Sequence, residues 1–366
     1  MHTPSLPLSA AAQLPLGRRP KGKTLLTAEW LLGWRNGGHC LLHNGEIVFE
    51  HNQILYVGPA FAGEVARRID FGKALISPGL IDLDALSDLE TYLLVQGNQP
   101  GWAKGRVWPR SYLERGPYEM YSDEELAFQK RFSFGLLLLN GITSAAPVAS
   151  LYYRKWAETV TEFEAAATAA GELGLRVFLS PAYRSGGMVL EAPGRIEPVC
   201  EEARGRDGRR DAIGFIERNH GGFDGLSNGL LTPDRIETCT LPLLERTMAA
   251  AADLDCRVRI HMAQGQLERD TMQRLHKMSA PQWLAKHHLL SERLYARHAT
   301  HASSCDLDLY AEHGVSIAHS PLVSARMGSM LHSFAACRAR HQYRRGNRHR
   351  TPRHADEPAC RPDRLP

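Results

Sequence analysis

Hydrophobic and polar positions divide this chain into two parts with different periodicity. Between Thr24 and Ile76, short apolar runs alternate with turn residues, which is typical of a small unit made of β-strands. From Ala74 onward, short apolar runs alternate with longer segments whose apolar residues recur at i, i+3 and i+4. The pattern therefore predicts a small β unit followed by a series of strand–helix pairs.

In the first part, two strand-like segments flank His43-Asn44-Gly45. They are Cys40–Leu42 and Glu46–Phe49, and an Asn-Gly pair between such segments is a strong hairpin signal. We therefore predict a hairpin here, followed by a further strand that begins at Gln53. A unit of this size is too small to be stable alone and should pack on the second part of the chain.

The second part contains seven candidate strands with helical patterns between them. The strands are expected at 75–81, 141–144, 175–179, 229–231, 257–261, 294–298 and 314–319, and the clearest helices at 122–139, 156–173 and 241–254. Ser122 and Glu125 have the spacing of a capping box at a helix start. Seven alternations indicate a parallel sheet, and this number favours a (β/α)8 barrel over an open sheet. No strand-like segment follows residues 329–339, so we expect strand eight to be missing.

Composition and cysteine usage are those of a globular protein. The 366 residues can bury a large core, and no apolar run approaches the roughly 20 residues that span a membrane. Residues 1–22 have their basic side chains after the apolar part, the reverse of a secretory signal, so a disordered leader is expected. The seven cysteines include no Cys-x-x-Cys pair, which favours unpaired thiols in a reducing cytoplasm.

The net charge of +4 is concentrated at the end of the chain. From Ala336 onward there are nine Arg against three acidic residues, about +6, which leaves about −2 for the rest. The body therefore gives no reason to expect a nucleic-acid or membrane partner. The segment 336–366 is either a solvated basic tail or the product of out-of-frame reading of a GC-rich coding sequence.

Two weaker signals are interpreted as loops. Gly186-Gly187 lacks the strand–GxGxxG–helix setting of a dinucleotide site. The segment from Trp102 to Trp108 mixes basic and aromatic residues, which favours a loop over the barrel mouth or, alternatively, a substrate contact.

Four segments carry a resemblance to a known family. They are Gly72–Asp82, Val258–Gln264, Leu294–His301 and Gly314–Ser324. In this order and spacing they resemble the amidohydrolase superfamily, in its cytosine-deaminase and triazine-hydrolase branch. The resemblance covers about five-sixths of the chain, from Thr24 to Phe334. It implies a metal-dependent hydrolase barrel over 77–335, preceded by a β unit over 23–76, with zinc or iron as the expected divalent metal.

The first segment departs from the family at its metal ligands. There, Pro-Gly-Leu-Ile-Asp is followed by His-x-His, whereas this chain has Asp84 and Leu86 at the two positions. An apolar side chain cannot bind a metal, but a carboxylate can. Asp84 is therefore either a substitute metal ligand or a hydrogen-bonded residue at a strand end.

The second segment resembles the fifth barrel strand, where a metal-ligand His is followed three residues later by a proton-shuttling Glu. The resemblance makes His261 the metal ligand, with a hydrogen-bonded structural His as the alternative, and places Gln264 at the catalytic position. An amide has no proton equilibrium near neutral pH, so the acid/base role is unfilled.

The third and fourth segments resemble strands six and seven. His298 matches the catalytic His that contacts the water or substrate carbonyl, and His301 and His319 match positions that contact substrate. The Gly-Thr-Asp of strand eight, whose Asp is a ligand and base in the family, does not occur. The resemblance therefore indicates a divergent copy, truncated or frameshifted at its end, that has lost several functional groups.

Two functions remain open. The first is hydrolysis of a carbon–nitrogen bond, as a deaminase or chlorohydrolase acting on a nitrogen heterocycle, with this copy weakened or inactive. The second is a catalytically silent barrel that binds a small heterocycle or a partner subunit. Assembly as a homo-oligomer is compatible with both, and nucleic-acid binding by the Arg-rich tail is a third, weaker alternative.

Overall fold

The computed structural model describes residues 21–35, 37–87, 107–115, 121–148, 158–321 and 324. The predicted leader over 1–22 lies almost entirely outside the described residues. The predicted tail over 336–366 and the segment in which an eighth strand would follow also lie outside them. The domain limits at both ends therefore stay predictions.

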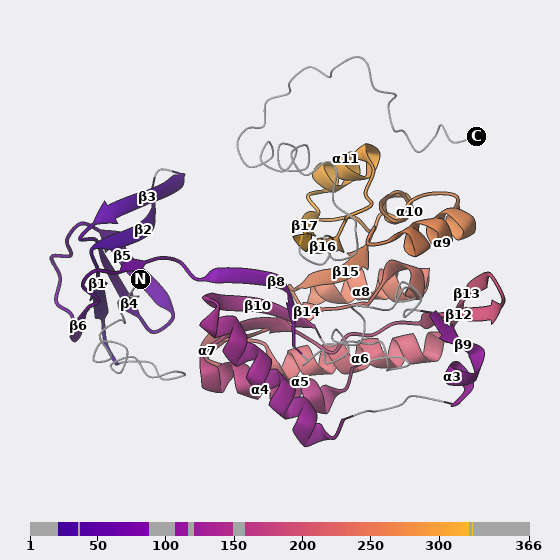
Figure 1. Cartoon of the computed structure of the whole chain (residues 1–366), viewed down its shortest axis with the longest axis horizontal. Helices are drawn as coiled ribbons and strands as arrows, with labels where there is room; N and C mark the ends of the chain where they lie inside the picture. Colours follow the sequence, from indigo (N-terminus) through magenta and orange to yellow (C-terminus); the bar gives the residue numbers. More distant parts are fainter. Residues whose placement is uncertain are drawn as a thin grey trace, which may run out of the picture.

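Residues 24–76 form two small sheets, coloured indigo in Figure 1. One has the strand order β5-β4-β1-β6 and the other β3-β2-β7. The strands are β1 (Thr24–Thr27), β2 (Trp30–Arg35), β3 (Gly38–His43), β4 (Glu46–Glu50), β5 (Gln53–Gly58), β6 (Arg67–Asp70) and β7 (Leu75–Ile76). Leu25, Leu31 and Val48 are buried and supply the apolar centre. The predicted N-terminal β unit is confirmed.

The hairpin predicted around Asn44-Gly45 is wrong. β3 pairs with β2 and β4 pairs with β1 and β5, so the two segments enter different sheets. Asn44 does adopt a left-handed conformation, with φ of 52°, but its N–H donates to the carbonyl of Glu29 instead of closing a turn. A side chain at Gly45 would meet Leu31 at 2.8 Å, so this glycine permits the close crossing.

The remainder of the chain is built around one sheet of seven parallel strands, in the order β17-β16-β15-β14-β11-β10-β8. The strands are β8 (Leu80–Leu86), β10 (Ile142–Val148), β11 (Arg176–Leu179), β14 (Ser227–Leu231), β15 (Arg257–Met262), β16 (Leu294–His298) and β17 (Ser316–Ala318). All seven correspond to strands expected from the sequence. β8 carries the chain from the N-terminal sheets into this larger sheet (Figure 1).

The sheet curves into a nearly closed barrel. Arg259 on β15 donates to the carbonyl oxygens of Ala146 and Pro147 on β10, at 2.7 and 3.0 Å. Tyr295 on β16 donates to the carbonyl oxygen of Leu83 on β8 at 3.5 Å. These bonds join strands that are not neighbours in the sheet, so they must cross the barrel interior. The predicted barrel class is confirmed, with seven strands among the described residues.

Helices cover the outside of the barrel (Figure 1). They are α4 (Asp123–Leu139), α5 (Val160–Leu173), α6 (Glu202–Asn219), α8 (Leu241–Asp253), α9 (Gln266–His276), α10 (Ala280–Lys286) and α11 (Ser304–His313). Short elements lie between them: α3 (Arg110–Arg115), α7 (Gly222–Gly225) and the 3-10 turn η2 (Ile236–Thr238). The capping box predicted at the start of α4 is present, because Ser122 accepts from the N–H of Glu125 and Glu125 accepts from that of Ser122.

The main core lies between these helices and the outer face of the barrel. Ala166 and Ala170 of α5 are small enough for the helix to lie close to the sheet, where Val177 and Leu179 point towards it. Phe163 fills the remaining space against Phe215 of α6 at 6.3 Å between ring centroids. Each buried side chain of this size contributes roughly 1.5–3 kcal/mol relative to exposure, so helix packing stabilises the barrel.

Two expectations from the sequence are corrected. Gly186-Gly187 is not a loop: it begins β12 (Gly186–Ala192), which pairs with β13 (Arg195–Cys200) in a hairpin joined by β9 (Val107–Pro109). An added Cβ at Gly186 would meet the carbonyl oxygen of Val199 at 2.4 Å, so the glycine serves close strand contact. Among the cysteines, Cys305 takes part in a disulfide, so the expectation of an entirely unpaired set is wrong.

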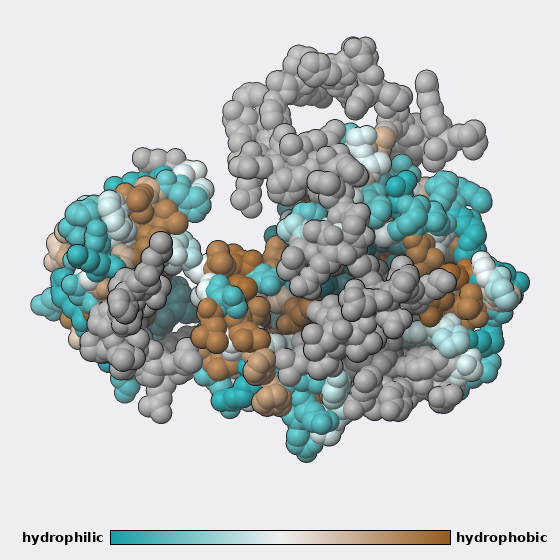
Figure 2. Space-filling model, viewed as in Figure 1, coloured by the Kyte–Doolittle hydropathy of each residue, from teal (hydrophilic) through white to brown (hydrophobic). Residues whose placement is uncertain are grey.

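One face of the molecule exposes an apolar patch, brown in Figure 2 over β8 and α4. Its exposed side chains are Leu80, Ile81, Leu83, Phe128, Phe132, Leu136 and Leu139. Among the described residues, β8 is an edge strand of the seven-stranded sheet. No helix in the described part of the chain is long and apolar enough to cross a membrane.

Candidate active site

The predicted site residues on the strands lie at one rim of the barrel. Parallel strands place their carboxyl ends on the same side, and Asp84, His261 and His298 all lie near the ends of their strands. His261 and His298 stack with ring centroids 5.5 Å apart. The structure therefore brings the two histidines together at the mouth.

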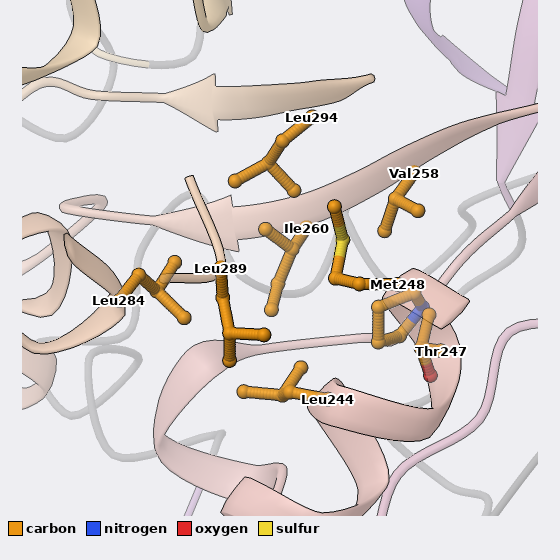
Figure 3. A pocket seen from close by; sticks show the side chains of 9 residues that line it. Leu244, Thr247, Met248, Val258, Ile260, Leu284, Leu289 and Leu294 are labelled. Atoms are coloured by element: carbon orange, nitrogen blue, oxygen red, sulfur yellow. The ribbon is translucent and has the colours of Figure 1, made fainter. Parts of the chain in front are cut away.

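Side chains alternate between the two faces of β15, and only the inward face contributes side chains to the barrel mouth. Arg259 and His261 point inward, whereas Val258 and Ile260 point outward. The outer pair line a small hollow together with residues of α8, α10 and β16, such as Leu244, Leu284 and Leu294 (Figure 3). This hollow is part of the packed core behind the strand and is apolar apart from Thr247. It has none of the groups needed for catalysis.

His261 is held in one tautomer by its neighbours. Its Nδ1 lies 2.6 Å from the carbonyl oxygen of Asp234, and 3.5 Å from a carboxylate oxygen of the same residue. Its Nε2 lies 2.5 Å from Nη1 of Arg297, which can only donate. The proton is therefore on Nδ1, and the lone pair of Nε2 accepts from the guanidinium.

The carboxylate of Asp234 is held in place by a buried arginine. Its carboxylate accepts from Arg184 at 3.2 Å, and both side chains are buried. The Arg184 guanidinium lies 4.6 Å over the ring of Trp108, which belongs to β9 and not to a loop over the mouth. Trp108 therefore supports the orientation of His261 through two intermediate residues.

Gln264 links His298 to a second arginine. Arg235 donates to Oε1 of Gln264 at 2.5 Å, so the amide nitrogen must point to His298, whose Nε2 lies at 2.8 Å. Since the amide donates, Nε2 of His298 accepts and its proton is on Nδ1. The amide orients the ring but has no proton to exchange near neutral pH.

The backbone at this rim is strained. His298, Ala299 and Ala263 have positive φ angles of 75°, 52° and 53°, a region that side chains other than glycine seldom adopt. Such conformations cluster at functional sites because the surrounding structure must hold them. Here Ala299 donates to the carbonyl of Met262, and His301 donates to that of Ala263.

A buried glutamate holds the loop that comes after β15. Glu268 accepts from the N–H groups of Ala263 and Gln264, at 2.6 and 2.8 Å. Burial, and then the nearby carboxyl of Glu237, raise the pKa of Glu268 above its ordinary value, which the two backbone bonds only partly offset. This residue therefore positions Gln264 and is not exposed to a ligand.

Asp84 and Arg297 form the remaining part of the site. Nε of Arg297 contacts Oδ1 of Asp84, and the hydroxyl of Ser320 donates to Oδ2. Nε2 of His298 lies 4.0 Å from Oδ2. Burial lowers the pKa of Arg297 to about 9, while Asp82 acts in the opposite direction, so the guanidinium stays charged at neutral pH.

The described residues do not fit a catalytic metal. Such a site needs three protein ligands and an open position, and no group of three His, Cys, Asp or Glu side chains in the described part of the chain could hold an ion. The two strongest candidate ligand atoms, Oδ1 of Asp84 and Nε2 of His261, both face the Arg297 guanidinium. Leu86 is 39% exposed and contributes no ligand.

The other two predicted site histidines are half-buried at the same rim. His319 comes after β17, and its Nδ1 lies 3.4 Å from the carbonyl oxygen of His298. His301 comes after β16 and is tied to the loop beyond β15 through its backbone N–H. Their roles towards a substrate stay predictions.

The sequence interpretation missed the arginines of the site, which are Arg184, Arg235, Arg259 and Arg297. One signal could have identified two of them. Arg259 and Arg297 are charged residues within strands whose residues are almost all buried, which is unusual unless the charge is paired inside the barrel.

No family model matches the chain, but it is similar in sequence to curated deaminases of other organisms. It is 24% identical over 291 residues to the 5-methylthioadenosine/S-adenosylhomocysteine deaminase of Desulforudis audaxviator, covering 78% of this chain and 60% of that protein. It is 26% identical over 298 residues to the 5'-deoxyadenosine deaminase of Methanothrix thermoacetophila, covering 81% and 62%. The chain thus spans about three-fifths of the length of the curated relatives that it matches.

Solved structures share the fold. The triazine hydrolase of Arthrobacter aurescens superposes with a TM-score of 0.65 at 22% identity, covering 84% of this chain and 67% of that one. The guanine deaminase of C. acetobutylicum, solved with guanine in its active site, superposes with a TM-score of 0.63 at 15% identity, covering 84% and 70%. An adenosine deaminase of Xanthomonas campestris with a TM-score of 0.61 at 15% identity, covering 87% and 66%, was solved with bound zinc.

Proposed function

We propose that this chain, a member of the amidohydrolase superfamily, binds a small nitrogen heterocycle at its barrel mouth without metal-dependent hydrolysis. Its relatives are deaminases of adenosine-type compounds. Adenosine-type nucleosides are therefore the first ligands to consider.

One observation carries the proposal that hydrolysis is absent. The guanidinium of Arg297 contacts both the carboxylate of Asp84 and Nε2 of His261, so the atoms that would bind a metal are already engaged. The superfamily's metal supplies a Lewis acid and an activated water. Gln264 adds a second reason, since its amide cannot take a proton from a water and return it to a leaving group.

The remaining rim groups are suited to holding a heterocycle. His261 and His298 stack on each other and are buried, whereas Arg235 and Gln264 beside them are half-buried and carry donors and an acceptor. A nitrogen-rich ring can hydrogen-bond to this second pair at the rim. These contacts bind and orient a ring but do not break its bonds.

The test measures binding and turnover on the same full-length protein. Thermal melts with 5'-deoxyadenosine, 5'-methylthioadenosine, guanine and atraton report binding, because a ligand at 100 times its Kd adds about 2.7 kcal/mol of stability. Ammonia release is followed in parallel, with and without added zinc or iron. We expect stabilisation by at least one adenosine-type ligand and no metal-dependent ammonia.

Matched variants locate the binding. Gln264→Ala should abolish the stabilisation, whereas Gln273→Ala, an exposed glutamine on α9, should leave it unchanged. If none of the compounds stabilises the protein, heterocycle binding is refuted.

Hydrolysis of a C–N bond is the second candidate function. It is favoured by the placement of His261 and His298 at one rim, where the resemblance expects a ligand and a catalytic histidine. Metal-dependent ammonia release at an ordinary enzymatic rate, lost in His261→Ala, would establish this function and refute the silent barrel.

We also propose that the protein works in the cytoplasm, because Cys40, Cys200, Cys239 and Cys256 are free thiols, although the disulfide of Cys305 weighs against this compartment. Because Cys239 and Cys256 are buried, alkylation is carried out in denaturant on protein taken directly from cells, and it should label all four thiols.

A further inference from the structure

We propose that the guanidinium of Arg297 takes the place of the superfamily's divalent metal in this chain, as an internal cation that joins Asp84 to His261 and keeps metal out. The proposal rests on the amidohydrolase-type barrel. It does not depend on which ligand the mouth binds.

The strand register puts the three residues at one level of the barrel. β15 and β16 are neighbours, and His261 is directly paired with Arg297 in their ladder. Asp84 lies on β8, at the opposite edge of the seven-stranded sheet, and the curvature of the barrel brings it to the same place. Arg297 therefore spans the gap between the first strand and the fifth, where the resemblance places metal ligands.

The tautomer of His261 is the one that a metal ligand needs. A ligating imidazole typically donates its other N–H to a carbonyl or carboxylate, which leaves one lone pair for the metal. His261 meets this condition, because Nδ1 faces the carbonyl and carboxylate of Asp234. The lone pair of Nε2 is then directed at Nη1 of Arg297, 2.5 Å away.

The contact between Arg297 and Asp84 is the second way in which the guanidinium stands where the superfamily has a metal ion. Nε of Arg297 contacts Oδ1 of Asp84, while Ser320 donates to Oδ2. A guanidinium is planar, keeps its charge and presents several donors in a fixed fork, so it can engage a carboxylate and an imidazole at once. The His-to-Asp change at position 84 and the arginine at position 297 thus make sense together, because the carboxylate balances the charge that the arginine introduces.

Burial supports a structural role for this cation. The side chains of Arg297, His261 and Asp84 are 8%, 8% and 12% exposed. A buried arginine is stable only where its charge is paired and its donors are used. A metal could bind here only if the guanidinium gave up both contacts. Its charge would then lie in surroundings that pair it less well than Asp84 and His261 do.

The experiment compares the zinc response of matched variants of the full chain. Melting temperatures are measured in EDTA and in zinc chloride, and bound zinc is counted after gel filtration. The chain has 17 His and seven Cys that could bind zinc elsewhere, so wild type is compared with His261→Ala. We expect both proteins to show the same zinc-induced shift and the same zinc content.

Removing the guanidinium should open the site. Arg297→Ala should gain one zinc, held by Asp84, His261 and the nearby Nε2 of His298, 4.0 Å from Oδ2 of Asp84. It should also gain a zinc-dependent rise in melting temperature, and both gains should disappear in Arg297→Ala/His261→Ala. If Arg297→Ala does not fold, Arg297→Lys replaces it, because a single ammonium cannot engage Asp84 and His261 as a fork does.

Two results would overturn the proposal. The first is a zinc ion on the wild-type protein that is lost in His261→Ala or Asp84→Asn, since the guanidinium would then not exclude metal. The second is a folded Arg297 variant with no gain in zinc. Neither readout uses ligand binding or ammonia release, so failure here is distinguishable from failure of the proposed function.

Discussion

A buried ion pair between α4 and α5 offers the sharpest test of how the helices pack around the barrel. Nζ of Lys130 lies 2.6 Å from Oε1 of Glu162, and both side chains are fully buried. The ammonium also lies 5.9 Å over the ring of Phe163. Lys130→Met keeps the length and apolar stem of the side chain but removes its charge, so the buried carboxylate of Glu162 loses this ammonium.

The expected loss can be worked out from the geometry. At 2.6 Å and an effective dielectric constant of about 20, the pair attraction is about 6 kcal/mol. Much of that attraction offsets the desolvation of the two ions, so the pair adds little net stability, whereas breaking it by removing one partner typically costs about 3–5 kcal/mol. For a domain of a few hundred residues this corresponds to a fall in melting temperature of roughly 6–20 °C.

The assay is thermal unfolding followed by circular dichroism, with Lys130→Met/Glu162→Leu as the matched control. The double variant removes both charges, so most of the loss should be recovered. The loss in the single variant should also be smaller in acid, where the carboxyl of Glu162 can take up a proton. A change below about 1 kcal/mol in the single variant, which is typical of exposed pairs, would show that water reaches this pair and that the reasoning is wrong.

Three further variants test the site and its support. Because burial raises the pKa of Glu268, the folded protein holds a proton that the unfolded chain has released. Stability should therefore fall as pH rises from the ordinary carboxyl range through that raised pKa, and Glu268→Gln should remove this fall. Melting temperatures of wild type and Glu268→Gln that differ by the same amount at every pH would contradict this. Tyr183→Phe should cost about 1–3 kcal/mol in urea unfolding, because its hydroxyl lies 2.9 Å from that of Thr247 and both are buried; an unchanged midpoint would refute this. Gly186→Ala should destabilise the β12–β13 hairpin by roughly 1–3 kcal/mol, since the new Cβ would lie 2.4 Å from the carbonyl oxygen of Val199, and limited proteolysis should cut there faster.

The elements of the barrel could be predicted from the sequence because their determinants are local. All seven expected strands were found, since each is an apolar run bounded by helical periodicity. The start of α4 was predicted for the same reason, because Ser122 and Glu125 are three residues apart and cap each other. The hairpin at Asn44-Gly45 failed because the pairing of its flanking segments depends on which sheet each one enters, and this is a long-range choice.

The candidate site likewise has features that the sequence could predict and features that depend on long-range contacts. The positions of His261, Gln264 and His298 at strand ends could be inferred from the sequence, since strand direction alone places them at one rim. The sequence by itself also determined that Asp84, Leu86 and Gln264 depart from the residues the resemblance expects. It could not show that Arg297 lies between Asp84 and His261, because these residues are far apart in the chain and meet only when the sheet curves. Only the tertiary structure decided which cation Asp84 and His261 face, since a buried charge takes whichever partner the fold brings within reach.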